Sequence, residues 1–401
     1  MNLWGQNIVV FSLFRFDADI ESTAYTVASK LAEHNRVFYV DNPYTLRDWW
    51  VNKNSMSFKK RRRFFSLFSR EVIDTGNPNF KVVIPPLVLS LHFLPEGFLY
   101  RLLLGLNEFL IRFRIRRILR RFGVTDYIFI NAFNFHYPTV ARKLSPSLRV
   151  YYCLDPVAGN FDGKHGIKSE AMLVGDADLV ICSSKNLYAH KLEMNPNSYL
   201  VPNAADIFHS GKATRPETAV SEALVGIPRP VIGYFGSIEH RFDFELVYKV
   251  ASARPEWSFV LAGPVFAEDL AGLDKLKNVH FTGRIPYAGM PAVIKGFDVA
   301  VIPFRKDEGS AAVFPLKLFE YLGAGKPVVA TDFNPDLAEY TEDMVAYCKD
   351  AASFEAAISR EMETDSPERV AERTRLAAQH TWDRRVETIS SLLSQTLAGR
   401  T

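Results

Sequence analysis

Two charged residues in one short segment, Lys317 and Glu320, have the types and the spacing to bind a nucleotide diphosphate. The segment spans residues 315–332 and reads PLKLFEYLGAGKPVVATD. Its leading proline suits the first helical position, so a helix is predicted there, with the amides of Val313 and Phe314 at the positive end of its dipole. Such an end binds phosphate, and Lys317 adds a full positive charge. Glu320 shares the face of Lys317 and suits the two hydroxyls of a ribose.

A purely structural interpretation of this segment also fits the residues. In that interpretation it is an ordinary helix–strand unit with a Lys–Glu pair at the surface. Gly323 and Gly325 are predicted to end the helix, and the apolar, β-branched residues 327–331 to form the next strand. The residues alone leave both interpretations open.

The elements that must position these residues alternate along the chain. In the first half, strands are predicted at residues 8–13, 36–41, 81–84, 127–131, 150–153, 179–183 and 199–201. Helical patterns lie between most of them, for instance at residues 21–33 and 137–144, and a last helix is predicted at 381–397. The alternation continues after Val231. This order predicts an α/β fold of two parallel, doubly wound sheets.

Several segments resemble retaining glycosyltransferases of the GT-B type, in the large family-four group. Residues 298–332 carry the strongest similarity, and weaker similarity extends over residues 126–390. The family has two glutamates with seven residues between them; Glu320 stands at the second and Ala312 at the first. The other segments that carry the resemblance are RPVIGYFGS, WSFVLAG, NVHFTG, DVAVIPF, VICSS and VPNAAD.

The resemblance implies two Rossmann-like domains facing a central cleft. We expect an acceptor-side domain at residues 1–207, a linker at 208–230, a nucleotide-sugar-binding domain at 231–380, and a helix at 381–401 that returns to the first domain. It also implies a donor site. The expected donor-binding residues are Gly236, Ser237, Arg241, Gly263, Arg284, Val313, Phe314, Pro315, Leu316, Lys317 and Glu320.

The acceptor side offers fewer candidates for chemistry. The family often places a histidine at the end of the strand DYIFIN, where this chain has Asn131; His136 follows in the next loop. Asp155 follows the strand at 150–153, where a carboxylate could orient an acceptor hydroxyl or act as a base. His136 could instead cap the following helix, and Asp155 could instead cap a helix or a turn. Two further acceptor-side candidates, Asp17 and Asp19, follow the first strand.

The implied reaction transfers a sugar from a UDP- or GDP-linked donor with retention, through attack on the face from which the phosphate leaves. No cofactor is predicted. No Asp-x-Asp motif lies at a likely donor loop, since Asp17-Ala18-Asp19 lies in the first domain, so no metal is predicted. Lys317, Arg241 and the helix dipole would stabilise the diphosphate. A sugar-nucleotide epimerase of the same fold and a catalytically idle scaffold are alternatives. A dinucleotide oxidoreductase is set aside because the first loop, FSLFRFDAD, has no glycine.

Length and composition fit this interpretation. A chain of 401 residues exceeds one ordinary core, and 48% hydrophobic with 23% charged residues is ordinary for a globular protein. Cys153, Cys182 and Cys348 are far apart and indicate buried thiols in a reducing compartment. No signal peptide or transmembrane segment is predicted. We therefore expect a cytoplasmic protein.

Two basic stretches interleaved with phenylalanines lie in the first domain. Such a pattern is typical of an interfacial helix on anionic lipid, and otherwise of a solvated charged face. The pattern predicts a peripheral location at the inner face of the membrane and a glycan or lipid-linked acceptor there; no nucleic-acid motif accompanies it. The expected membrane-facing residues are Lys59, Lys60, Arg61, Arg62, Arg63, Arg116, Arg117 and Arg120.

Overall fold

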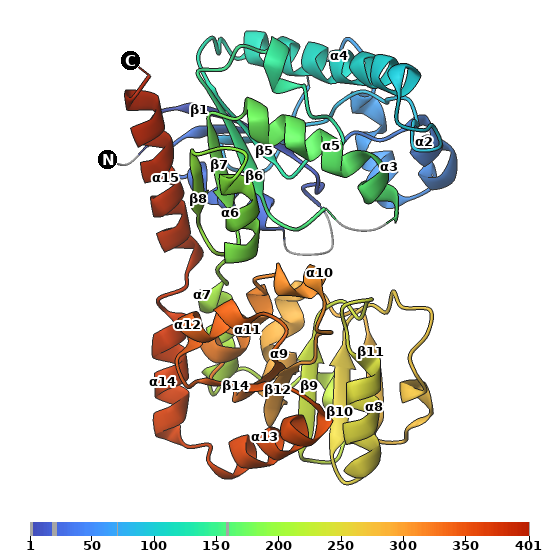
Figure 1. The fold of residues 1–401 in the computed structure, drawn as a ribbon, viewed down its shortest axis with the longest axis vertical. Coiled ribbons are helices and arrows are strands. Elements are labelled where there is room, and N and C mark those ends of the chain that lie inside the picture. Colours follow the sequence, from blue (N-terminus) through green and yellow to red (C-terminus); the bar gives the residue numbers. More distant parts are fainter. Residues whose placement is uncertain (1–2, 18–21, 70, 158–159, 401) are drawn as a thin grey trace. The chain divides into compact units, whose positions relative to one another are not determined.

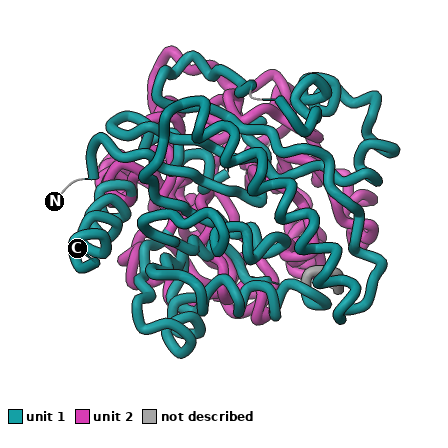
Figure 2. Tube along the Cα trace, turned by 90° about the horizontal axis from the view of Figure 1, so that it is seen from above, with its two compact units in different colours: residues 1–202, 386–401 teal, residues 203–385 magenta. Residues whose placement is uncertain are grey.

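The computed structural model describes residues 3–17, 22–69, 71–157 and 160–400 and divides the chain into two units (Figure 1). Unit 1 comprises Met1–Pro202 and Val386–Thr401, and unit 2 comprises Asn203–Arg385. Figure 2 shows that two separate segments of the chain make up unit 1. The division assigns the first four residues of the last helix, α15 (Trp382–Ala398), to unit 2 and the others to unit 1.

Unit 1 contains an eight-stranded sheet in the order β3-β4-β2-β1-β5-β6-β7-β8. Its strands are β1 (Asn7–Ser12), β2 (Arg36–Val40), β3 (Ile73–Asp74), β4 (Phe80–Val83), β5 (Ile128–Ala132), β6 (Leu148–Cys153), β7 (Leu179–Cys182) and β8 (Ser198–Leu200). Its other helices are α1 (Thr23–Leu31), α2 (Leu46–Asn52), α3 (Met56–Arg61), α4 (Phe98–Arg121), α5 (Asn160–Asp176) and α6 (Lys185–Leu192). Only the two-residue β3 pairs antiparallel among the described strands.

Unit 2 contains a six-stranded parallel sheet in the order β11-β10-β9-β12-β13-β14. Its strands are β9 (Val231–Phe235), β10 (Ser258–Ala262), β11 (Val279–Gly283), β12 (Val299–Ile302), β13 (Val328–Thr331) and β14 (Val345–Cys348). Its helices are α7 (Ile207–Ser210), α8 (Phe244–Ala253), α9 (Met290–Lys295), α10 (Glu308–Ala311), α11 (Leu316–Gly323), α12 (Ala338–Thr341), α13 (Ala351–Glu363) and α14 (Pro367–Ala377).

The central strands of the two sheets follow one topology. Counted in chain order, β11-β10-β9-β12-β13-β14 reads 3-2-1-4-5-6, and β4-β2-β1-β5-β6-β7 repeats this order in unit 1. Strand residues such as those of β12 and β13 are buried throughout, as expected for parallel sheets covered on both faces. The predicted pair of doubly wound α/β sheets is confirmed. Ligands of such sheets bind where the strand order reverses, which is between β1 and β5 and between β9 and β12.

Two local predictions were wrong. Residues 137–144 contain only a 3-10 turn at Ala141–Lys143, because the carboxylate of Glu108 on α4 binds the amide and hydroxyl of Thr139 and holds the chain out of a helix. Residues 208–230 form no separate linker: they carry short helical turns, and Ala213 and Leu224 are buried in the core of unit 2. The division between the units lies earlier, after Pro202.

Candidate functional site

Helix α11 starts at the topological switch point of unit 2. Pro315 is its N-cap, so the helix begins at Leu316, one residue after the predicted start. The amide of Val313 donates to the carbonyl of Ser310 (3.0 Å), so it is not available to an anion as predicted. The first-turn amides of Leu316 and Lys317, which have no acceptor within a helix, take that place. Tyr321 fixes the helix against β9, because its hydroxyl accepts from the amide of Phe235 (2.8 Å) and donates to its carbonyl (3.2 Å).

Lys317 is held between two aromatic rings at the end of β9. Its ammonium donates to the hydroxyl of Tyr234 (3.2 Å) and lies 4.9 Å from the Tyr234 ring centroid and 4.7 Å from that of Phe304. Burial lowers the pKa of Lys317 to about 8, although the carboxylates of Glu320 and Glu239 favour its charged form. The lysine is therefore preorganised and partly desolvated, which strengthens its attraction for an added anion.

The glycine turns after β9 and β10 bring main chain close to Lys317. Gly236 and Gly263 adopt φ values of 149° and 154°, which side chains rarely allow. A Cβ on Gly263 would lie 1.9 Å from the carbonyl oxygen of Gly236, and one on Gly236 would lie 3.0 Å from Cε of Lys317. The carbonyl of Ser237 accepts from the hydroxyl of Tyr234 (2.8 Å), so one tyrosine holds both the turn and the lysine.

Glu320 is buried one turn along α11 from Lys317. The hydroxyl of Tyr287 donates to Oε1 of Glu320 (3.0 Å), and the Tyr287 ring stacks on that of His209 with 4.7 Å between centroids. Nε2 of His209 lies 2.9 Å from the carbonyl oxygen of Tyr287. Tyr234, Tyr287 and His209 were not among the predicted site residues. Tyr234 was visible as the tyrosine before the glycine turn of RPVIGYFGS, whereas nothing in the sequence links Tyr287 to Glu320.

Arg241, Arg284 and Ala312 lie elsewhere in unit 2. Arg241 pairs with Glu239 (3.2 Å), and its positive charge opposes protonation of Lys317, which places the two cations near each other. Arg284 is exposed directly after β11, two strands from β9. Ala312 is buried at the end of α10, so no carboxylate occupies the position of the family's first glutamate.

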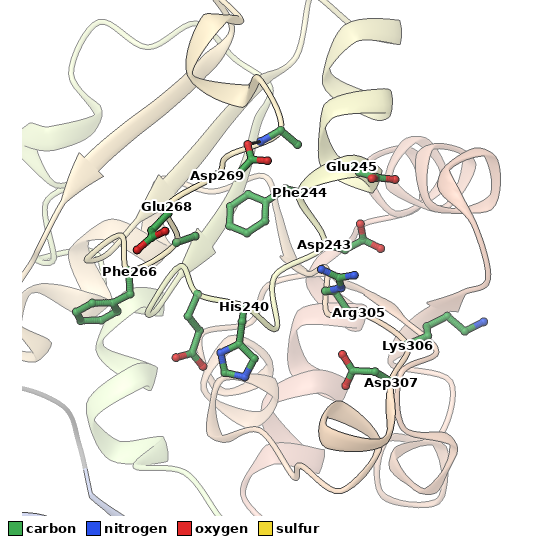
Figure 3. A pocket seen from close by; sticks show the side chains of 13 residues that line it. His240, Asp243, Phe244, Glu245, Phe266, Glu268, Asp269, Arg305, Lys306 and Asp307 are labelled. Atoms are coloured by element: carbon green, nitrogen blue, oxygen red, sulfur yellow. Dashed lines mark hydrogen bonds between the residues drawn. The ribbon is translucent and has the colours of Figure 1, made fainter. Parts of the chain in front are cut away.

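A cavity of about 820 Å³ borders this site (Figure 3). Loops after β9, β10 and β12 line it, and most of its charged side chains are carboxylates. Two of these, Asp243 and Asp307, cap α8 and α10. Such a lining repels a diphosphate, so the phosphate-binding end of the site is the Lys317 region rather than this cavity. Glu239, which lines the cavity and pairs with Arg241, connects the two.

Comparisons with known proteins agree on this fold and on this half of the chain. Residues 229–364 match the family described as glycosyl transferases group 1. The whole chain has the GT-B fold: it resembles sucrose-phosphate synthase from Thermosynechococcus elongatus (TM-score 0.68, 15% identity, 98% of this chain and 100% of that one). It also resembles the UDP-forming trehalose-phosphate synthase from Burkholderia vietnamiensis (TM-score 0.70, 11% identity, 100% and 99%).

One curated relative is similar in sequence. TuaH of Bacillus subtilis (strain 168), named as a teichuronic acid biosynthesis glycosyltransferase, is 28% identical over 244 residues, which cover 53% of this chain and 60% of the relative. This chain therefore spans less than two thirds of the relative's length. HepE of Anabaena, solved in complex with UDP, has a TM-score of 0.63 at 13% identity over 97% of this chain and 100% of that one.

In the other half of this GT-B fold, two of the predicted catalytic residues are tied into local structure. The side chain of Asn131 closes a turn: it donates to the carbonyl of Asn134 (3.1 Å) and accepts from its amide (2.7 Å). His136 packs against the rings of His92 and Phe135, and burial lowers its pKa to about 4, so its imidazole is neutral at neutral pH. Asp155 lies partly exposed after β6, and its role in orienting an acceptor hydroxyl or acting as a base stays a prediction.

The predicted acceptor residue Asp17 belongs to a buried ion cluster. The guanidinium of Arg61 binds both oxygens of Asp17 and contacts Oδ2 of Asp41 through Nε (3.0 Å) and Nη2 (2.8 Å). Burial opposes ionisation of Asp17, but the hydrogen bonds and charge of Arg61 outweigh it and hold the pKa of Asp17 below its usual value. Burial raises the pKa of Asp41 to about 6. Asp19 lies outside the described residues.

The predicted membrane-facing set is therefore only partly at the surface. Arg61 is fully buried, because it neutralises the two carboxylates at the ends of β1 and β2; its assignment to the membrane was wrong. Arg117 is half-buried and donates to the carbonyl of Phe68 (3.0 Å). The other predicted residues are exposed: Lys59, Lys60, Arg62, Arg63, Arg116 and Arg120. Helix α4 also does not keep all its basic residues on one exposed face, since Arg112 and Arg114 are buried.

None of the helices in the described residues is long and apolar enough to cross a membrane. The same residues contain no group of three or more His, Cys, Asp or Glu side chains placed to hold a metal ion.

Proposed function

We propose that this protein transfers a sugar, with retention, from a UDP- or GDP-linked donor to a glycan or lipid-linked acceptor. The observation that carries the proposal is the pair Lys317 and Glu320 on α11, each positioned by a tyrosine where the strand order of unit 2 reverses. The group 1 match over the same residues and the UDP bound to HepE support it. The name of TuaH supports an acceptor in cell-surface polysaccharide synthesis.

The proposed chemistry assigns Lys317 and Glu320 separate roles. Lys317, Arg241 and the first-turn amides of α11 stabilise the negative charge that grows on the leaving diphosphate, as preorganised donors do. Glu320 accepts from the ribose hydroxyls. The acceptor attacks from the face that the phosphate leaves, and a phosphate oxygen takes its proton. This scheme needs no nucleophile from the enzyme. Asp155 and His136 are assigned the role of orienting the acceptor.

The acceptor side of the proposal places the enzyme in the cytoplasm at the inner face of an anionic membrane. Exposed basic residues in unit 1 support this, because each lysine or arginine near such a surface contributes about 1 kcal/mol of attraction. The attraction should be weakened by salt, as the Debye length falls from about 10 Å at 0.1 M to about 3 Å at 1 M.

Calorimetry with UDP and GDP tests the donor site. Lys317→Ala and Glu320→Ala each remove a charge-assisted hydrogen bond, which costs about 1.5–3 kcal/mol, so affinity for the preferred nucleotide should fall about ten- to a hundredfold. Lys306→Ala is the matched control, because Lys306 is a nearby exposed lysine paired with Asp332. Wild-type affinity in both α11 variants would overturn the donor assignment.

A nucleotide-sugar-binding protein without transferase activity is the second candidate. Two observations favour it: Ala312 is buried where the family has a glutamate, and the side chain of Asn131 is engaged in a turn. Incubation of the protein and membrane extract with radiolabelled nucleotide sugars separates the two. Label that enters glycan or lipid supports the transferase; tight donor binding with neither transfer nor hydrolysis supports the second candidate.

A further inference from the structure

Helix α2 of unit 1 is well capped, yet none of its residues is buried. A capping box between Thr45 and Asp48 fixes its start, and the amide of Leu46 donates to the carbonyl of Val88 (2.9 Å). None of its residues is buried, and Trp50 is 69% exposed. Tryptophan side chains are large and bury much apolar area when they find a partner. A well-capped helix that leaves two tryptophans in solvent presents a contact surface.

Helix α4 adds a second exposed apolar strip to the same region. Its inner face packs on the sheet, whereas Leu99, Leu102, Leu106 and Phe109, spaced three, four and three residues apart, line one outer stripe and are all exposed. Segment 88–90 links this helix to α2: the side chain of Asn107 on α4 forms two hydrogen bonds with Leu89 (2.8 and 3.0 Å), and Val88 pairs with Thr45 and Leu46.

We call the exposed apolar residues of α2 and of this stripe of α4 the apolar ridge. Its members are Leu46, Trp49, Trp50, Val51, Leu99, Leu102, Leu106 and Phe109. Figure 1 shows α2, α3 and α4 within unit 1.

The charges around the apolar ridge decide what covers it. The exposed charged residues of 46–69 other than the Asp48 of the capping box are all basic, and basic residues continue the outer side of α4. They are Arg47, Lys53, Lys59, Lys60, Arg62 and Arg63, followed on α4 by Arg116, Arg120 and Arg121. A second copy of this surface would bring like charges together. An anionic bilayer satisfies both the charges and the apolar side chains, and tryptophan is the residue enriched at its interface.

We propose that the apolar ridge inserts into the interface of an anionic bilayer while the surrounding basic residues bind its headgroups. This inference rests on the proposed membrane-proximal acceptor and deepens it. Arg61 is buried and is not among the basic residues that bind headgroups. Here Trp49 and Trp50 supply a contribution that salt does not screen, and the basic residues supply one that it does.

The test is cosedimentation with vesicles of phosphatidylcholine alone and of phosphatidylcholine mixed with phosphatidylglycerol. Trp49→Ser/Trp50→Ser should lower binding to the anionic vesicles by about tenfold or more, at low and at high salt, because two large apolar side chains no longer insert. Trp4→Ser is the matched control: Trp4 is 63% exposed elsewhere in unit 1 and stacks on His34, so its loss should leave binding unchanged.

Charge variants and fluorescence separate the two contributions. Replacing Lys59, Lys60, Arg62 and Arg63 by Ser should lower only the salt-sensitive part of the affinity for anionic vesicles, by about fivefold for each residue. Wild-type tryptophan emission should shift to shorter wavelength on anionic vesicles, and Trp49→Ser/Trp50→Ser should lose that shift.

Two outcomes would overturn the proposal. One is wild-type vesicle binding in Trp49→Ser/Trp50→Ser. The other is a dimer in ultracentrifugation that these substitutions dissolve, which would make the occupant a second copy. UDP affinity, measured on the same samples, should be unchanged in this variant. The two proposals can therefore fail separately. If the wild-type protein does not bind UDP, the donor-site proposal is wrong. If it does not bind anionic vesicles, the proposal for the apolar ridge is wrong.

Discussion

The two switch points of this protein are built from similar strands but use their polar residues differently. At β9 and β12, Lys317 and Glu320 are each held by one tyrosine, so that a cation and a carboxylate are positioned beside a glycine turn. Around β1 and β5, Arg61 binds the carboxylates of Asp17 and Asp41, and the side chain of Asn131 binds the main chain of Asn134, so these polar groups are satisfied within the fold. The partner of a polar residue at a strand end, more than its type, decides whether it serves the fold or a ligand.

Breaking the unit 1 cluster should give the largest effect. Arg61→Ala leaves the Asp17 and Asp41 carboxylates without their buried partner, and losing one member of a buried ion pair costs about 3–5 kcal/mol of stability. Urea unfolding followed by tryptophan fluorescence measures it. Arg62→Ala is the matched control, because this neighbour is exposed and should change stability by at most about 0.5 kcal/mol. Equal stability of the two variants would mean that Arg61 is not structural.

The same contrast explains what the sequence could predict. Buried β-branched runs and helical periods identify a parallel sheet, because burial on both faces imposes them locally. The predicted bounds of β1, β2 and β5 all lie within about one residue of those in the structure. The pairing of Arg61 with Asp17 joins residues 44 positions apart, and that of Tyr287 with Glu320 joins residues 33 apart. No local pattern encodes such pairs. Arg61 was therefore grouped with its exposed neighbours in the basic run.

The affinity of the donor site for UDP should fall at high pH, because its cation is a lysine. The cation of the unit 1 cluster is an arginine, Arg61, instead. Because burial lowers the pKa of Lys317 to about 8, UDP affinity should be constant from pH 7 to somewhat below 8 and then fall, by up to about tenfold per pH unit, as the ammonium loses its proton. The shift acts oppositely on folding: between about 8 and 10.5 the folded chain binds fewer protons than the unfolded one, so this group raises stability with pH.

Calorimetry from pH 7 to 10 checks this, with Lys317→Met as the control. That variant keeps an apolar stem without a titrating group, so its weak affinity should not vary with pH. A wild-type profile as flat as that of Lys317→Met would show that Lys317 does not contact the phosphates.

A smaller effect should come from the tyrosine that positions Glu320. Tyr287→Phe removes one donor to the Glu320 carboxylate and leaves the ring on His209. Because Tyr287 acts on the ribose only through Glu320, the expected loss of binding free energy is that of one ordinary hydrogen bond, about 0.5–1.5 kcal/mol. UDP affinity should fall about three- to tenfold, and the preference for UDP over its 2′-deoxy analogue should narrow, because Glu320 is less firmly oriented toward the ribose. Tyr248→Phe, on the exposed side of α8, is the control. An unchanged ribose preference would assign Tyr287 to packing alone.

The smallest effect is expected from removing divalent metal. Lys317, Arg241 and the first-turn amides of α11 already supply positive charge where the diphosphate binds, so a cation has little left to neutralise. UDP affinity in excess EDTA should equal that in magnesium or manganese within about twofold, and the Lys317→Ala variant should become more metal-dependent than wild type, because it lacks the competing charge. Strict dependence of wild-type binding or transfer on either metal would show that Lys317, Arg241 and the helix amides do not suffice to bind the diphosphate. The polar residues at the switch point of unit 2 would then not form a complete ligand site by themselves.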